Sequence, residues 1–216
     1  MTITGLKQLR FITPGVIIVL FFALFSLVTG IFSVSSLTKI QVPIISIVVF
    51  GFGLLYYITP FREASNQQYF DEVNQNLVDG LLRIAGLDNS EGRYKWSDVR
   101  RIFYPIVDKD KSLEKKSARL FQNGYAWTTA ADARVISAFF ALGSWLYFCV
   151  KYVISGFNSG IWATLMFVVI YLITVPISRF LTDRHKKLGD EQLEIIEQYY
   201  RDELRNELVG MSGSGS

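Results

Sequence analysis

Four long stretches of the chain carry almost no charge, and charged residues are dense between them. The first stretch, 11–38, contains no Lys, Arg, Asp or Glu. Its apolar part at 16–34 comes close to the ~30 Å of hydrocarbon that a helix rising about 1.5 Å per residue must cross. A second stretch, 40–60, follows at once, and two more are joined by a turn-rich segment. The pattern predicts an all-α membrane protein with four transmembrane helices in two hairpins, at about 14–34, 41–60, 135–154 and 161–178.

The first stretch could also be a secretory signal peptide, because Lys7 and Arg10 precede it. Its apolar run exceeds the roughly 7–15 residues of a signal core, and a second apolar stretch follows where a hydrophilic mature chain would begin. A retained transmembrane helix is therefore the better interpretation. The prolines fit this hairpin, because Pro14 and Pro43 lie near the starts of the two helices and Pro60 follows the second.

The distribution of basic residues predicts the orientation. Two of the 22 Lys and Arg residues, Lys39 and Lys151, lie in the short loops, and the other 20 lie in the amino end, the segment 62–134 and the tail. Basic residues accumulate on the cytoplasmic side of a membrane. We therefore expect a multi-pass membrane protein with both termini in the cytoplasm.

Between the hairpins, residues 62–134 are predicted to form a small helical cytoplasmic module. Apolar residues at 70, 73, 77, 81 and 84 repeat every three or four positions, which predicts an amphipathic helix that ends near Gly86. A short helix capped by Ser97 should end before Pro105, and a third should run from Ser112 to Asn123 and Gly124.

After the fourth span, residues 179–210 are predicted to form a cytoplasmic amphipathic helix. Asp190 opens it, and apolar residues at 193, 196, 200, 204 and 208 line one face. This face could pack on the module or form a short coiled coil. Residues 211–216 resemble an artificial linker. The predicted domains are the N-terminal hairpin at 1–61, the module at 62–134, the second hairpin at 135–178, the tail helix at 179–210 and the linker.

The composition excludes the commonest catalytic arrangements. Half of the residues are hydrophobic, 19% are charged and the formal net charge is +3. With one cysteine, Cys149, and one histidine, His185, the chain forms no internal disulfide, Cys/His zinc site or haem attachment pair. We expect His185 at the membrane edge or facing a phosphate.

Motifs for chemistry are missing as well. No phosphate loop or nucleophile elbow occurs, and the spans carry no ionisable residue at mid-depth, which disfavours an ion-coupled transporter. We therefore expect no enzyme activity, no cofactor and no metal site.

Two basic clusters in the module are the candidate ligand- or partner-binding residues. Aromatic rings beside Arg and Lys can bind a nucleotide or an oligonucleotide by stacking and charge neutralisation. A solvated surface or a contact with anionic lipid explains the same pattern, because acidic residues are interspersed. The candidates are Arg93, Lys95, Trp96, Arg100 and Arg101 in the first cluster, and Lys115, Lys116 and Arg119 in the second.

The spans also predict self-association. Homo-oligomers are usually closed and symmetric, and we expect a tetramer. A neutral pore between protomers could be lined by Ser26, Thr29 and Ser33 on one face of the first span. Packing within one chain is the alternative role for such small and hydroxyl residues.

In architecture, the chain resembles small membrane proteins of bacterial anti-phage defence. Its four spans are similar to KwaA, the membrane subunit of Kiwa systems, which works with a cytosolic partner. The segment 128–208 resembles the SLATT-type effectors, with 133–178 as the hairpin and 190–208 as the tail helix, although the hairpin at 11–60 departs from that plan.

The resemblance implies an oligomeric component of a defence system in the inner membrane of a bacterium, which conducts ions or permeabilises that membrane when its module senses a signal. The alternative is a non-conducting membrane sensor or scaffold that recruits a cytosolic partner protein.

Overall fold

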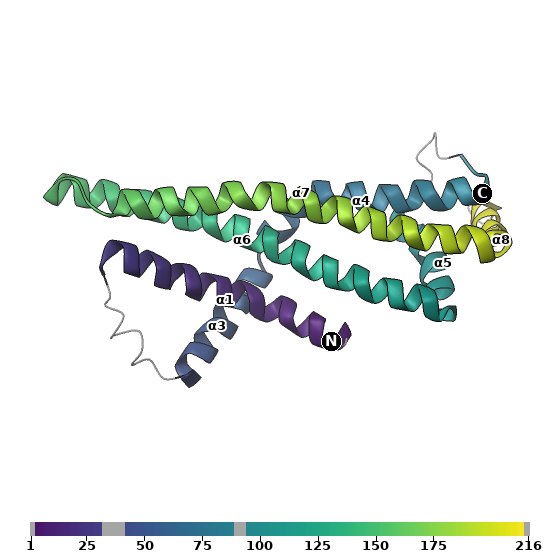
Figure 1. The fold of residues 1–216 in the computed structure, drawn as a ribbon, viewed down its shortest axis with the longest axis horizontal. Coiled ribbons are helices and arrows are strands. Elements are labelled where there is room, and N and C mark those ends of the chain that lie inside the picture. Colours follow the sequence, from purple (N-terminus) through teal and green to yellow (C-terminus); the bar gives the residue numbers. More distant parts are fainter. Residues whose placement is uncertain (1–2, 32–41, 89–93, 214–216) are drawn as a thin grey trace. The chain divides into compact units, whose positions relative to one another are not determined.

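The computed structural model describes residues 3–31, 42–88 and 94–213, and every element in these ranges is a helix, as predicted. The helices are α1 (Ile3–Thr29), α3 (Val42–Tyr57), α4 (Phe61–Ala85), α5 (Trp96–Lys109), α6 (Lys111–Ser155), α7 (Gly160–Tyr199) and α8 (Arg201–Gly213) (Figure 1). They form two compact units. Unit 1 comprises Met1–Asn66 and Tyr125–Arg179, and unit 2 comprises Gln67–Gly124 and Phe180–Ser216.

Three described helices are long and apolar enough to cross a membrane: the Leu9–Thr29 part of α1, α6 and α7. These helices support the prediction of a multi-pass membrane protein. The predicted second span corresponds to α3, which has 16 residues. At about 1.5 Å per residue α3 is about 24 Å long, which is shorter than the ~30 Å hydrocarbon layer.

In unit 1, α1 and α3 pack with their backbones in close approach. A Cβ atom on Gly15 would overlap the carbonyl oxygen of Val49, and one on Gly53 would overlap that of Phe11. Glycines are therefore required on both sides of this contact. Pro14, expected at a helix start, lies buried inside α1, because this helix already begins at Ile3.

The core of unit 1 is centred on Phe167, whose ring centroid lies 5.2 Å from that of Phe21 and 5.1 Å from that of Phe140. Ile17, Tyr56 and Ile136 complete the cluster. The helix α1 ends at Thr29 because Gly30 adopts φ 71°, a left-handed conformation that ends helices. The predicted end of this span, at residue 34, lies outside the described residues.

Unit 2 is a helical bundle with a continuous apolar core. The predicted stripe on α4 is confirmed, because Leu77, Leu81 and Ile84 are buried, and Leu204 and Leu208 of α8 join the same core. The predicted end of α4 is also confirmed. Gly86 adopts φ 71°, and its N–H and that of Leu87 donate to carbonyl oxygens in the last turn of α4.

Two predicted helix boundaries are wrong, because Asn123 and Gly189 contact other helices there. Asn123 and Gly124 lie inside α6, where the Asn123 side chain donates to the carbonyl oxygen of Leu181 on α7 at 2.8 Å. Gly189 and Asp190 lie inside α7, where a Cβ atom on Gly189 would stand 3.1 Å from Leu77 Cδ2 on α4.

Three smaller predictions on helix ends in unit 2 are also wrong. Pro105 lies inside α5 at an exposed position, where water can solvate the carbonyl left without a backbone donor. The helix α5 begins at Trp96, ahead of Ser97, and no side chain caps it. The cap of α6 is Asp110 and not Ser112, because the Asp110 carboxylate accepts from the backbone N–H of Ser112 at 2.7 Å.

Met211, placed in the linker by sequence, lies within α8 and packs against the core of unit 2.

Candidate functional site

Helix α5 presents a basic surface because its sequence is strongly amphipathic. Its buried side chains are Val99, Ile102, Phe103, Ile106 and Val107. The opposite side exposes Arg100, Arg101 and Tyr104, spaced so that the tyrosine lies three and four residues after the arginines. We call these three residues the α5 surface.

The arginines of the α5 surface carry uncompensated charge. Neither Arg100 nor Arg101 forms an ion pair or a hydrogen bond with any residue that the structure describes. Lys95 is exposed just before the helix, and Arg93 lies outside the described residues. The structure thus places three of the four predicted basic residues of the first cluster on or next to one exposed helix.

Trp96 is half-buried, and it packs on its own helix. Its ring centroid lies 5.6 Å from that of Phe103 and 6.1 Å from that of Tyr104. The exposed aromatic ring beside the arginines is Tyr104, 50% of which is accessible. Sequence reasoning missed Tyr104, although its helical spacing from Arg100 and Arg101 was a usable signal.

The second cluster is partly neutralised. Lys116 Nζ donates to Glu191 of α7 at 2.6 Å, and this hydrogen bond lowers the pKa of the Glu191 carboxyl below its ordinary value. Lys115 and Arg119 are exposed, and the charge of Arg119 also acts on Glu191 and lowers the pKa of that carboxyl. The second cluster therefore presents less free charge than its three basic residues suggest.

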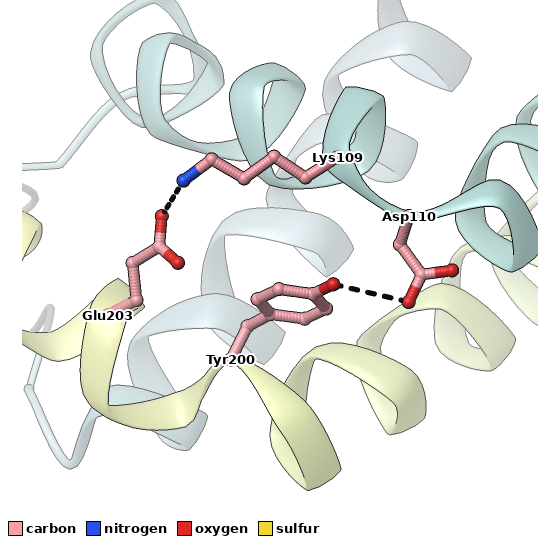
Figure 2. A network of polar contacts seen from close by, with 4 residues as sticks. All are labelled: Lys109, Asp110, Tyr200 and Glu203. Carbon is pink, nitrogen blue, oxygen red and sulfur yellow. Dashed lines mark hydrogen bonds and ion pairs between the residues drawn. The ribbon is translucent and has the colours of Figure 1, made fainter.

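A polar network ties α5 to the C-terminal helices (Figure 2). Lys109, at the end of α5, pairs with Glu203 of α8, and this hydrogen bond raises the pKa of the lysine. The Tyr200 hydroxyl, between α7 and α8, donates to Asp110 at 3.3 Å. Burial and the nearby carboxylate raise the pKa of Tyr200, whereas the hydrogen bonds from Ser112 lower that of Asp110.

This network joins the α5–α6 and α7–α8 junctions. The α5 surface is consequently held on a fixed element of unit 2, which suits a recognition surface better than a loose loop does.

Two of the three predicted pore residues, Ser26 and Thr29, lie on α1 and form hydrogen bonds within that helix. Ser26 is fully buried, and its hydroxyl donates to the carbonyl oxygen of Phe22 at 2.8 Å. The half-buried Thr29 donates to that of Phe25 at 2.7 Å. Ser33 lies outside the described residues. Both hydroxyls satisfy their donors on their own helix, so neither presents a free donor to a conduction path.

Sequence reasoning missed two buried ionisable residues in unit 1. Asp132 is fully buried and Arg134 is 9% exposed, and both lie inside the continuous helix α6. Arg134 Nη2 donates to the carbonyl oxygen of Ser65 on α4 at 2.7 Å. The third span was expected to begin after Arg134. Asp132 and Arg134 were therefore assigned to the cytoplasmic module, where a charged residue is not expected to be buried.

His185 packs against a polar side chain. Its Nδ1 atom lies 3.3 Å from the Asn123 amide nitrogen, between α7 and α6. Among the described residues, no group of three or more His, Cys, Asp or Glu side chains could hold a metal ion.

No protein-family model matches this chain, no curated protein matches it, and no solved structure matches its fold.

Proposed function

We propose that this chain is a membrane-anchored scaffold whose α5 surface recruits an acidic cytosolic partner protein. The observation that carries the proposal is the pair of exposed guanidinium groups beside Tyr104 on α5, which have no ion pair or hydrogen bond among the described residues. Arg and Tyr are among the residues that contribute most to protein interfaces, and guanidinium groups bind carboxylates in a bidentate geometry.

The surface of unit 1 favours an anchor over a conductor. Every exposed position at 11–29 of α1, 135–150 of α6 and 161–177 of α7 carries an apolar or aromatic side chain or a glycine. Lipid-facing helices have this character, whereas a channel wall needs polar groups or a wetted path. The conducting oligomer expected from the sequence is therefore the less supported function.

The class of partner follows from the resemblance in architecture to KwaA. That membrane protein works with a cytosolic partner, and we propose the same for this chain. In this proposal α3 is a fourth span that the bilayer accommodates by local thinning, and both termini lie in the cytoplasm of a bacterium. Reporter fusions after Arg119 and after Leu208 should both report the cytoplasm, and a periplasmic signal at either position contradicts the topology.

Charge reversal tests partner recruitment. Cross-linked complexes are purified from native cells that express the wild type, an Arg100→Glu plus Arg101→Glu variant, or a Lys115→Glu plus Arg119→Glu control with equally exposed charges. A partner that is captured by the wild type and the control, released by salt and lost from the α5 variant supports the proposal. Equal capture by all three chains overturns it.

Two further measurements separate the alternatives. A dinucleotide or single-stranded oligonucleotide that binds the wild type and not the α5 variant would replace the protein partner with a nucleic-acid ligand. Ion flux through liposomes that contain only the purified chain would favour conduction. Mass measurement in nanodiscs tests the proposed homo-tetramer, which a monomer in every lipid composition would exclude.

A further inference from the structure

A cleft of about 320 Å³ opens between α1 and α6 in unit 1. Two phenylalanine rings from each helix form its walls, and two small residues of α6 complete the lining. These residues are Phe22 and Phe25 of α1, with Phe139, Phe140, Gly143 and Ser144 of α6.

The lining of the cleft has no unsatisfied hydrogen-bond donor that an occupant would have to pair. Ser144 is its one polar side chain, and the Ser144 hydroxyl donates to the carbonyl oxygen of Phe140 at 2.6 Å. Its donor is thus satisfied on its own helix. An apolar occupant can therefore fill the cleft without leaving a buried donor unpaired.

The inner rings of the cleft are held in place, and the outer rings are exposed. Phe140 packs edge-on against Phe21 with the centroids 5.8 Å apart, and Phe25 packs on Tyr147 at 5.6 Å. Phe22 and Phe139 are about half exposed at the rim. A chain that enters between the rim rings meets a preformed aromatic wall.

Gly143 opens the cleft down to the backbone of α6. Apart from its chain neighbours and the backbone of its own helix, no heavy atom lies within 4 Å of the place where a Cβ atom on Gly143 would stand. The volume is roughly twice the ~150 Å³ of an apolar cavity that takes up benzene, which suits a segment of one flexible hydrocarbon chain.

Both walls belong to helices long and apolar enough to cross a membrane, Leu9–Thr29 and α6. Hydrocarbon surrounds such helices, and an unfilled gap would cost the ring faces their dispersion contacts. We propose that one acyl chain of a phospholipid occupies this cleft as a retained ligand. The proposal concerns the acyl chain alone and is independent of partner recruitment by α5.

A larger side chain at Gly143, where the cleft reaches the backbone of α6, tests whether an acyl chain occupies the cleft. In a Gly143→Phe variant, the new ring can enter the open space beside α6 and exclude the acyl chain. The matched control is Gly51→Phe on α3, another glycine with no atom within 4 Å of a Cβ position and no place in the cleft. Gly143→Leu is a milder variant in case the larger ring disturbs folding.

Native mass spectrometry after extraction in a mild detergent should find one phospholipid bound per chain in the wild type and in the Gly51→Phe control. The Gly143→Phe variant should lower the bound fraction by about tenfold, and Gly143→Leu by less. Unchanged helicity of each variant shows that the loss does not come from unfolding.

Photoreactive acyl chains locate the lipid. A phospholipid with a diazirine in its tail should label the peptides that contain 22–25 and 139–144 more strongly than other lipid-facing peptides. Even labelling over all exposed faces would overturn the proposal, and so would full lipid retention by Gly143→Phe. A third contradicting outcome is a change in the oligomer mass of Gly143→Phe when no lipid is bound to any of the chains. That result would assign the cleft to a second copy of the chain.

Discussion

The two units of this protein both have an apolar core, but their surfaces differ in polarity. Unit 1 buries Ser26, Asp132 and Ser178 and exposes large apolar side chains such as Leu20 and Phe50. Unit 2 buries Leu81 and Leu204 and exposes charges. The difference matches two solvents, because a lipid-facing surface has to be apolar and a water-facing surface has to be mostly polar.

The hydrogen bonds of the two units differ as well. In unit 1, Ser26, Ser144 and Ser178 each donate to a carbonyl oxygen four residues earlier on the same helix. In unit 2, polar bonds join different helices, as between Lys116 and Glu191 or Asn76 and Asp190. Unit 1 also has cross-helix bonds, as from Arg134 to the carbonyl oxygen of Ser65, but the ion pairs recorded between helices of the described residues lie in unit 2.

The largest difference in the free energy of unfolding is expected between a leucine-to-alanine substitution in the core of unit 2 and the same substitution on the surface of unit 1. Leu81→Ala removes a fully buried side chain from the core of unit 2 and should lower the free energy of unfolding by about 2–5 kcal/mol. Leu172→Ala, on the exposed face of α7 in unit 1, should change it by less than about 0.5 kcal/mol. Denaturant titration in lipid micelles followed by circular dichroism measures both. Equal losses would contradict the assignment of Leu172 to a lipid-facing surface.

The close packing of α1 on α3 in unit 1 is tested by adding a single methyl group at Gly15. Gly15→Ala places a methyl group on the backbone of α3 and should cost about 1–3 kcal/mol, the usual range for overpacking. Gly51→Ala has open space and should be neutral, or stabilising by up to about 1 kcal/mol through helix propensity. The same titration applies, and a harmless Gly15→Ala would mean that α1 and α3 are not in contact through Gly15.

The features that the sequence predicted correctly depend on local patterns. Long uncharged stretches predict apolar helices wherever they occur, and the spacing of Leu77, Leu81 and Ile84 marks a buried stripe. Gly86 ends its helix as predicted because a glycine adopts the left-handed conformation, here with φ 71°, at little steric cost. Each signal lies within a few residues of the feature that it predicts.

The features that the sequence missed depend on partners far along the chain. Asn123 and Gly124 read locally as a helix stop, but the Asn123 amide bonds to Leu181, 58 positions away. The same holds for the candidate site. Nothing near Lys116 indicates that Glu191 neutralises it, so its free charge was overestimated, whereas the exposure of Arg100 and Arg101 follows from the amphipathic pattern of α5 itself.

A smaller effect is expected at the cap that joins the two helix junctions of unit 2. Asp110→Ala removes the acceptor for the first N–H groups of α6 and for the Tyr200 hydroxyl, and should lower the thermal midpoint by less than Gly15→Ala does. Asp110→Asn can still cap the helix and should recover most of the loss. If Asn and Ala are equally damaging, the carboxylate charge and not the cap is the important feature.

The smallest effect on the thermal midpoint is expected at the ion pair between Lys116 and Glu191. This pair lies in unit 2, and its contribution should depend on pH. The hydrogen bond from Lys116 lowers the pKa of Glu191 in the folded chain, so the pair stabilises unit 2 above the ordinary carboxyl pKa of about 4. This contribution is lost as the pH falls through the lowered value and Glu191 becomes protonated. Lys116→Gln should therefore lower the thermal midpoint slightly at pH 7, and the difference from the wild type should shrink as the pH falls through the lowered pKa of Glu191. The control Lys115→Gln, at an exposed lysine without a recorded partner, should match the wild type across this range. A difference for Lys116→Gln that stays constant as the pH is lowered would show that the lysine acts through packing of its hydrocarbon stem and not through its charge.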